Sequence, residues 1–422
     1  MELEPVNYIT RNLRDNSRKD GITEDRIISA IHRVGEIWES RLCGGWIPPE
    51  ETVHPWAQIR LSLAALLPGL KKAQIKSESN ETLAGSFKGN VSTDTPLSAL
   101  ILAGNTPLMS WAPISACLLA GWAVVVKMSR EETLWPRLFL ESLADADTLL
   151  AARVSIHVWP GEEGRTAELC RCTDAVIAYG SDSTIDALRK WTPDSTPFFG
   201  FGHSISIGVG NFDNRGKNAD SDIESIISGA GIDGFARDML MFDQNGCLSP
   251  QFLLVKDRTS DRRVAKVAAK RIADALIQET KALEVSAVTN FGEAKTIREA
   301  RDLALFAGAT LYEDASLRWT VACYDRYIPP FANYVTGNRF LPVIPVEGMN
   351  QVVEICRTLR GRLSCIGFAG GFPKAIRQEI QVEGVSRVCQ AGEMQCPPLD
   401  WRNGNWDLVR ELHNLRLSGL FR

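Results

Sequence analysis

The sequence shows no large excess of charge of one sign, and no apolar run opens it. Its 422 residues carry 47 Lys and Arg against 51 Asp and Glu, so the net charge is −4 at pH 7. Without a basic surplus or a long basic run, there is no electrostatic basis for binding nucleic acid. The N-terminal stretch MELEPVNYITRNLRD is charged throughout, which argues against a secretory signal. We therefore expect a cytoplasmic protein.

Cysteine spacing of the kind that holds zinc is also missing. The chain has ten cysteines, and its closest pairs are Cys170 with Cys172 and Cys389 with Cys396. Neither pair has two intervening residues and a matching partner pair, so no metal site is predicted. In a reducing compartment the ten thiols are expected to be free.

One stretch, residues 95–126, has no charged residue and is long enough to suggest a membrane span. Gly104, Pro107, Pro113 and Gly121 interrupt it. These breaks favour a strand, a turn, a buried helix and a second strand, which together form the βαβ unit of a parallel sheet buried on both faces. We therefore predict no membrane span.

Alternating strands and helices predict an α/β fold that contains a doubly wound, Rossmann-type domain. Its expected strands are 97–103, 123–127, 154–159, 174–179 and 204–209. The pattern along the chain predicts an N-terminal helical segment (1–75) packed on a first α/β domain (76–210), a second α/β domain (211–396) and a C-terminal tail (397–422). Within these, 76–94 is polar and is expected to form exposed turns, and one helix is expected from about 223 to 242.

Several familiar motifs fail on their context. GAGIDG (229–234) has the glycine spacing of a dinucleotide-binding loop, but it follows a predicted helix instead of a strand. GHS (202–204) lacks the second glycine of a serine-hydrolase elbow, because Ser206 stands in its place. None of the five histidines is beside a cysteine, so the sequence proposes no Cys–His pair.

Three separated segments together resemble the aldehyde dehydrogenase superfamily, in its order and at about its spacing. They are ILAGNTP (101–107) leading to VVVKMS (124–129), VWPG (158–161) followed by AVIAYGS (175–181), and DQNGC (243–247). More narrowly, FDQNGCLSP (242–250), FGHS (201–204) and PLDW (398–401) resemble the LuxC family of acyl-CoA (fatty acyl) reductases. The resemblance covers about residues 95–410 and implies an aldehyde dehydrogenase-like fold with a cofactor domain and a catalytic domain.

The resemblance implies that Cys247 is the nucleophile. Reduction of a thioester needs a soft nucleophile that displaces coenzyme A, holds the acyl group and then leaves, and a thiolate does all three. The alternative is a small buried residue ahead of a strand. By the same resemblance Asn105, together with the backbone N–H of Cys247, holds the developing oxyanion. The alternative for Asn105 is an ordinary turn asparagine.

Five residues are implied to bind the cofactor. Lys127 matches the lysine that bonds the adenosine ribose, and Gly180 and Ser181 match residues at the pyrophosphate. Arg130 stands where relatives that use NAD often have a glutamate. With Ser129 it could bind a 2′-phosphate, which favours NADPH. The alternatives are a surface lysine, a helix-capping turn, and an arginine that opens the next helix.

Two departures from the superfamily affect the predicted chemistry. The segment FFGFGHS (198–204) has no carboxylate where hydrolytic relatives carry a general-base glutamate. Without that base, a thioester on the enzyme is expected to wait for hydride or coenzyme A and not to hydrolyse. Asn338 stands where the superfamily usually has a glutamate on the nicotinamide ribose.

These inferences together predict an NADPH-dependent acyl-CoA reductase that converts an acyl thioester to an aldehyde. One rival is a CoA-acylating dehydrogenase that oxidises a small aldehyde. Another is an acyl-carrying scaffold subunit with a degenerate cofactor site. The expected partners are acyl-CoA or another acyl thioester, an acyl-protein synthetase subunit and further copies of the chain.

Overall fold

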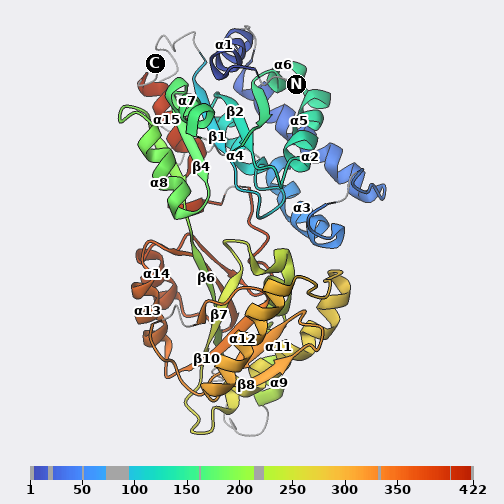
Figure 1. The fold of residues 1–422 in the computed structure, drawn as a ribbon, viewed down its shortest axis with the longest axis vertical. Coiled ribbons are helices and arrows are strands. Elements are labelled where there is room, and N and C mark those ends of the chain that lie inside the picture. The colour runs from blue at the N-terminus through green and yellow to red at the C-terminus, as the bar shows by residue number, and fades with distance from the viewer. Residues whose placement is uncertain are drawn as a thin grey trace. The chain divides into compact units, whose positions relative to one another are not determined.

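The computed structural model describes residues 4–17, 22–49, 52–72, 95–160, 163–212, 223–330, 334–399 and 401–419. The turns expected over 76–94 and Gly161 of the Trp-Pro-Gly segment lie outside these residues. The chain divides into two units, one formed by Met1–His203 with Pro398–Arg422 and the other by Ser204–Pro397 (Figure 1). We call them the first and the second unit.

The first unit is built on a five-stranded parallel sheet with the order β3-β2-β1-β4-β5. Its strands are β1 (Leu97–Ile101), β2 (Ala123–Met128), β3 (Val154–Val158), β4 (Ala175–Tyr179) and β5 (Phe198–Phe201). The uncharged stretch 95–126 is therefore the predicted βαβ unit, with α4 (Trp111–Leu119) between β1 and β2. No helix in the described part of the chain is long and apolar enough to cross a membrane.

Helices cover both faces of this sheet, as a doubly wound fold requires (Figure 1). Val124 and Val126 of β2 pack with one group of helices, and Ala123 and Val125 pack on the opposite face. The first group is α2 (Glu24–Cys43), α3 (Trp56–Lys71), α4 and α5 (Leu134–Ala146). The second group is α1 (Val6–Ser17), α7 (Glu163–Cys172) and α8 (Asp182–Trp191), and a short helix, α6 (Thr148–Ala151), precedes β3.

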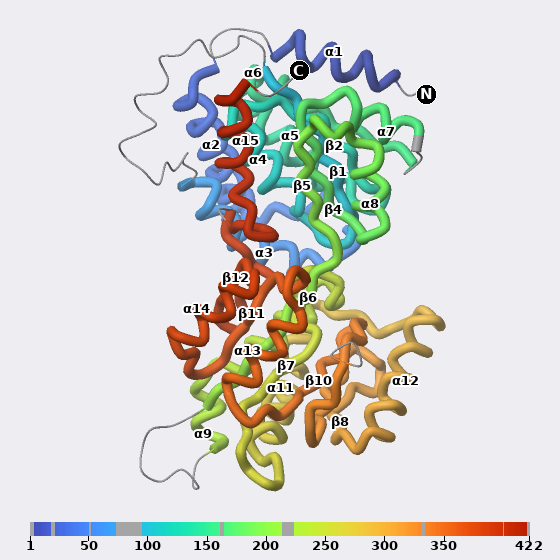
Figure 2. The backbone as a smooth tube through the Cα atoms, turned by 90° about the vertical axis from the view of Figure 1, so that its left-hand side faces the viewer, coloured from blue at the N-terminus to red at the C-terminus, as the bar shows by residue number. Residues whose placement is uncertain are grey.

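The last helix, α15 (Leu408–Ser418), returns to the first unit and lies beside α4 (Figure 2). The indole Nε1 of Trp122, which is fully buried, donates a hydrogen bond to the Leu412 carbonyl at 2.9 Å. The N-terminal helices α2 and α3 pack on the same side through Trp38, whose ring lies 5.2 Å from that of Trp111. Segments from both ends of the chain thus complete one hydrophobic core.

The second unit contains a seven-stranded sheet with the order β12-β11-β6-β7-β10-β9-β8, parallel except for β8. Its strands are β6 (Ile205–Asn211), β7 (Pro250–Lys256), β8 (Thr310–Glu313), β9 (Thr320–Cys323), β10 (Phe340–Val346), β11 (Leu363–Gly370) and β12 (Arg387–Gln390). The strand that we expected over 204–209 in the first domain is β6, so its placement in that domain was wrong. It pairs with β7 and β11, and the chain leaves the first unit before it.

The helices of the second unit differ from expectation at one place. The single helix expected over 223–242 is broken, because the glycines of GAGIDG interrupt it and Gly231 has a φ of 78°. Its pieces are α9 (Ile223–Ser228), α10 (Gly234–Leu240) and the 3-10 turn η2 (Met241–Gln244). The remaining helices are α11 (Arg263–Ala282), α12 (Phe291–Phe306), α13 (Met349–Thr358), α14 (Lys374–Val382) and, in the tail, η4 (Asn403–Asn405).

Candidate functional site

The predicted cofactor residues of the first unit lie at the carboxyl ends of its strands. Ile101 of β1 is in register with Lys127 of β2, so the loops that follow the two strands start side by side. A side chain at Gly104 would put its Cβ 2.6 Å from Ser129 Oγ, so the two loops touch. Asn105, next to Gly104, is exposed. The structure therefore brings the Asn105 loop and the Ser129 segment together.

Two positive charges meet at the end of β2. Desolvation and the nearby charge of Arg130 lower the pKa of Lys127. Arg130 itself is exposed and lies ahead of α5, which begins at Leu134, so it does not open that helix. Glu132 faces the helix, where its Oε1 accepts a hydrogen bond from Trp135 N at 3.2 Å. A pair of cations at a strand end is suited to an anionic ligand.

Gly180 and Ser181 connect β4 to α8. The Ser181 hydroxyl caps the helix by accepting a hydrogen bond from Thr184 N at 3.2 Å. A Cβ at Gly180 would lie 3.0 Å from Thr184 Cγ2, so the turn is tight. The hydroxyl of Ser181 thus has the capping role that we considered as the alternative. The amino end of α8 still carries backbone N–H groups of the kind that bind phosphate.

The segment 198–204, which has no carboxylate of its own, contains a buried aromatic ring. Phe199 is 5% exposed and packs edge-on against Trp406, with ring centroids 5.3 Å apart. A carboxylate does approach the same segment from α8, because Asp182 Oδ1 accepts a hydrogen bond from His203 N at 2.7 Å. Sequence reasoning missed Asp182, which lies 21 residues from His203 along the chain.

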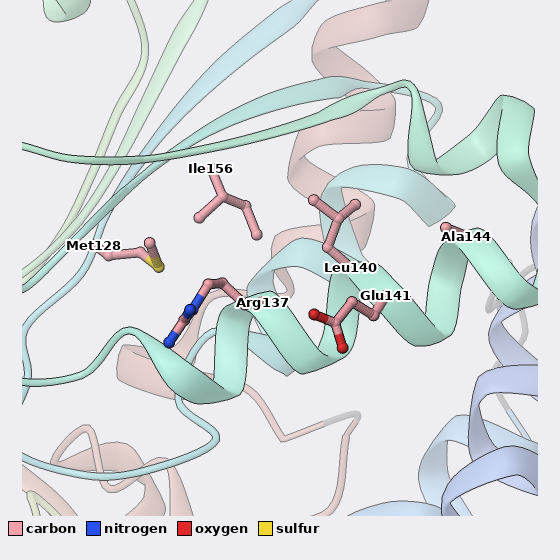
Figure 3. Close-up of a pocket in the computed structure, with 6 residues that line it drawn as sticks. All are labelled: Met128, Arg137, Leu140, Glu141, Ala144 and Ile156. Atoms are coloured by element: carbon pink, nitrogen blue, oxygen red, sulfur yellow. The ribbon is translucent and has the colours of Figure 1, made fainter. Parts of the chain in front are cut away.

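A pocket of about 370 Å³ lies beside α5 (Figure 3). Met128 of β2 and Ile156 of β3 line it together with α5 residues Arg137, Leu140, Glu141 and Ala144. Met128 belongs to the face of β2 that packs against α4 and α5. Since side chains alternate along a strand, its neighbour Lys127 points to the other face. The pocket is therefore not part of the predicted cofactor site.

Cys247 lies in the second unit, in the turn between η2 and β7. The turn is entered through three consecutive left-handed residues, Phe242, Asp243 and Gln244, with φ values of 54°, 55° and 62°. Each such residue costs about 1–2 kcal/mol unless glycine occupies the position. A run of three therefore needs contacts that hold it in place.

The side chain of Gln244 supplies the main contacts that hold this turn. It is 2% exposed, and its Nε2 donates to the carbonyls of Pro250 and Phe340 at 2.8 and 3.1 Å. Its Oε1 accepts a hydrogen bond from Phe340 N at 2.9 Å. Asp243 forms an ion pair with Arg339, which is 6% exposed and also left-handed, with a φ of 57°. We call residues 242–247 the nucleophile turn after the role predicted for Cys247, and these contacts fasten it to the start of β10.

A second set of contacts supports the other side of the turn. Asp238 is fully buried, and its carboxylate accepts hydrogen bonds from Gly392 N and Met394 N at 2.6 and 3.0 Å. Desolvation raises the pKa of this carboxyl to about 7 in spite of those donors. Gln395 in the same loop donates to the buried Ser249 hydroxyl, two residues after Cys247. The loop 391–396 therefore supports the turn around Cys247 through Asp238 and Ser249.

Two properties of Cys247 point in opposite directions. The residue is exposed, which lets a substrate reach it. Desolvation nevertheless raises the pKa of its thiol to about 11, whereas its own backbone N–H and the Ser204 hydroxyl act to lower that pKa. The raised pKa means that the resting thiol is protonated at neutral pH.

All ten cysteines are free thiols, and most of them are buried. Among the described residues, no group of three or more His, Cys, Asp or Glu side chains is placed to hold a metal ion. Asn338, where we noted a departure from the superfamily, is left-handed with a φ of 54° and adjoins Arg339. It therefore belongs to the segment that fastens the nucleophile turn.

Comparison with known proteins agrees with the predicted family. The family described as Acyl-CoA reductase (LuxC) matches residues 91–417. Two relatives, each named long-chain acyl-protein thioester reductase, come from Aliivibrio fischeri (28% identical over 159 residues) and Vibrio harveyi (29% over 155 residues). The matches cover 37% and 36% of this chain but only 31% and 30% of those relatives, so the similar part is about a third of their length.

Solved aldehyde dehydrogenases share the fold. The indole-3-acetaldehyde dehydrogenase AldA of P. syringae, solved with NAD+, superposes with a TM-score of 0.64 at 13% identity and covers 92% of this chain and 80% of its own. The aldehyde dehydrogenase AldC of Pseudomonas syringae, solved with NAD+ and octanal, gives a TM-score of 0.64 at 15% identity, with coverages of 91% and 80%. The predicted aldehyde dehydrogenase-like fold is thereby confirmed.

Proposed function

The chain belongs to the LuxC family of acyl-CoA reductases, and from that premise we propose that it reduces an acyl thioester to an aldehyde through a thioester on Cys247. The observation that carries the proposal is the turn around Cys247. An exposed thiol is held there by a strained backbone that buried side chains fasten on both sides. Strain of this kind is kept where a reactive group has to be positioned.

The first half of the reaction exchanges one thioester for another. The Cys247 sulfur forms a bond to the acyl carbon, the bond to the donor's sulfur breaks, and the thiol proton leaves with the departing thiol in the net balance. Because desolvation favours the neutral thiol, proton loss is part of the barrier that the site must lower. The backbone N–H of Cys247 and the amide of Asn105 are the donors proposed for the oxyanion.

The second half needs a hydride at the acyl carbon, which bound NADPH would supply; the bond from that carbon to the Cys247 sulfur would then break, and the sulfur would take up a proton as the aldehyde leaves. Lys127 and Arg130 fit an anionic adenosine phosphate, because the two cations meet at the end of β2. Ser129, pressed against Gly104, adds a hydroxyl beside them. Gly180 and Ser181 at the start of α8 fit the pyrophosphate, where the tight turn leaves the backbone accessible. These residues would hold the cofactor at the carboxyl edge of the first sheet.

A long-chain acyl group is the proposed substrate, since the relatives of this chain are named long-chain acyl-protein thioester reductases. The test is incubation with palmitoyl-CoA without NADPH, followed by peptide mass mapping. We expect the acyl group on Cys247, and Cys247→Ala should lose both the label and aldehyde formation. Cys43→Ala removes another exposed thiol and should keep both. A label on any other cysteine would show that the assignment is wrong.

The acyl-enzyme is proposed to resist water. The segment 198–204 has no carboxylate of its own where, by the resemblance, hydrolytic relatives carry a base, and the nearby Asp182 carboxylate accepts a hydrogen bond from His203 N. We expect release of free acid without NADPH to be at least about 100-fold slower than reduction with it, the factor that a positioned base contributes. Asp182→Asn should leave that slow release unchanged. Rapid release that Asp182→Asn abolishes would instead identify Asp182 as a base.

A further inference from the structure

Two serines at the start of β6 both interact with Cys247. Ser204 directly precedes β6, and Ser206 is its second residue. Ser206 is fully buried, and Ser204 is partly buried. Both reach the residue that the proposed function makes the nucleophile.

The hydroxyl of Ser206 joins the nucleophile turn to a neighbouring strand. It donates to the Cys247 carbonyl at 2.7 Å and accepts a hydrogen bond from Cys365 N of β11 at 3.1 Å. The register of β6 shifts at this point on both sides, between Ser206 and Gly208 toward β7 and between Leu363 and Ile366 toward β11. The side chain therefore supplies hydrogen bonds that the backbone ladder lacks there.

The hydroxyl of Ser204 reaches the other end of the same residue. It forms a hydrogen bond with the Cys247 thiol and acts against the desolvation that raises the pKa of that thiol. A hydroxyl donor stabilises a thiolate more than a neutral thiol, because the acceptor then carries a full charge. Ser206 thus bonds to the carbonyl of Cys247, and Ser204 acts on its thiol.

In a purely structural explanation, the Ser206 hydroxyl would only satisfy backbone groups that the register shift leaves without a strand partner. It could then bond to any such group near the shift. The acceptor observed here is the carbonyl of Cys247 itself, which fixes the peptide that carries the reactive side chain. The hydroxyl of Ser204, two residues earlier in the chain, acts on the Cys247 thiol.

We propose that Ser204 and Ser206 act together on Cys247, Ser206 as a positioning residue that fixes its peptide and Ser204 as a donor to its thiolate. The inference rests on the proposed function, because it takes Cys247 as the nucleophile. It predicts separate effects for the two serines. Ser206 controls how fast the acyl group is transferred, whereas Ser204 controls how much thiolate is present at a given pH.

The experiment compares Ser204→Ala, Ser206→Ala and Ser206→Thr in the full chain. Single-turnover acylation by palmitoyl-CoA measures transfer, and iodoacetamide labelling of Cys247 at pH 9, followed by mass mapping, measures thiolate. The matched control is Ser98→Ala, since Ser98 is equally buried and its hydroxyl also donates to a strand carbonyl, that of Ala123 at 3.1 Å. Melting temperatures of all variants show whether they fold alike.

Ser206→Ala should acylate about 10-fold more slowly, the loss expected from one buried hydrogen bond. Its labelling at pH 9 and its affinity for NADPH should stay the same. Ser206→Thr, which keeps the hydroxyl, should recover the acylation rate. Ser204→Ala should label about 10-fold more slowly at pH 9, because removal of a donor to a charged acceptor raises the pKa of the thiol.

The inference is overturned if Ser206→Ala acylates within about 2-fold of the parental rate or if Ser204→Ala labels at the parental rate, since either result leaves less than half the expected effect of one hydrogen bond. It is also overturned if Ser98→Ala slows acylation as much as Ser206→Ala does. These outcomes are distinct from failure of the proposed function. If the parent carries no acyl group on Cys247, the proposed function fails whatever the serines do. If the parent is acylated there and the serine variants match it, only the present inference fails.

Discussion

Gln244→Ala tests whether the left-handed turn before Cys247 depends on its contacts with β10. Gln244 makes three hydrogen bonds of 2.8 to 3.1 Å with Phe340 and Pro250 while only 2% exposed. At about 1 kcal/mol each, their loss should cost the second unit about 3 kcal/mol. The three left-handed residues together cost about 3–6 kcal/mol in the folded state, so the freed turn should relax away from its present shape.

The assay is segment-resolved hydrogen exchange, which measures the free energy of opening for β7 and β10 separately from the first unit. Gln251→Ala is the matched control, because Gln251 is only half-buried and its bonds to Gln244 O and Ser249 O are long, at 3.4 and 3.3 Å. Gln251→Ala should lower the free energy of opening by less than about 1 kcal/mol. The reasoning is refuted if Gln244→Ala lowers the free energy of opening by less than about 1 kcal/mol, or if Gln244→Ala and Gln251→Ala lower it equally.

Three further predictions concern the chemistry. Asn105→Ala should slow acylation about 10²–10³-fold in stopped-flow measurements, with unchanged affinity for NADPH, because it removes the side chain proposed as an oxyanion donor. Arg130→Glu should lower the ratio of kcat/KM with NADPH to that with NADH by about 100-fold, since a carboxylate replaces the group proposed to bind the phosphate. Alkylation of Cys247 should rise about 10-fold per pH unit from pH 7 to 10, because a thiol whose pKa is raised to about 11 stays neutral until that range.

Each of these predictions has a result that contradicts it. An unchanged acylation rate in Asn105→Ala would return that residue to the role of a turn asparagine. Preference for NADH in the parent protein would contradict the proposed role of Arg130 in binding the 2′-phosphate of NADPH. A plateau in Cys247 alkylation below pH 9 would mean that the thiol is less desolvated than its surroundings indicate.

Local signals predicted much of the first sheet. Residues 95–126 could be assigned as strand, helix and strand because a buried parallel strand is apolar on both faces and glycine and proline mark its ends. The expected helix over 223–242 was wrong because its apolar spacing continues past the glycines that break it. The strand β6 was assigned to the wrong sheet, since nothing in its own residues says which strands will flank it.

The contacts around Cys247 could not be predicted, because their partners are distant in sequence. Gln244 and Phe340 are 96 residues apart, and Ser206 and Cys365 are 159 apart. Such pairs meet only because β6, β7, β10 and β11 are neighbours in one sheet. The resemblance predicted Cys247 as the nucleophile, whereas the groups that hold its turn in place became visible only with the sheet order.

The return of α15 to the first unit has a consequence for biosynthesis. The first unit consists of Met1–His203 and Pro398–Arg422, so the entire second unit is translated before its last helix appears. That helix covers Trp122, and the Arg416 guanidinium packs on Gly121 so closely that a Cβ there would lie 1.8 Å from its Nη1. On the ribosome the second unit can therefore fold while the first unit still has an open face. A nonsense mutation or proteolytic cut ahead of α15 would destabilise the first unit and leave the turn around Cys247 intact.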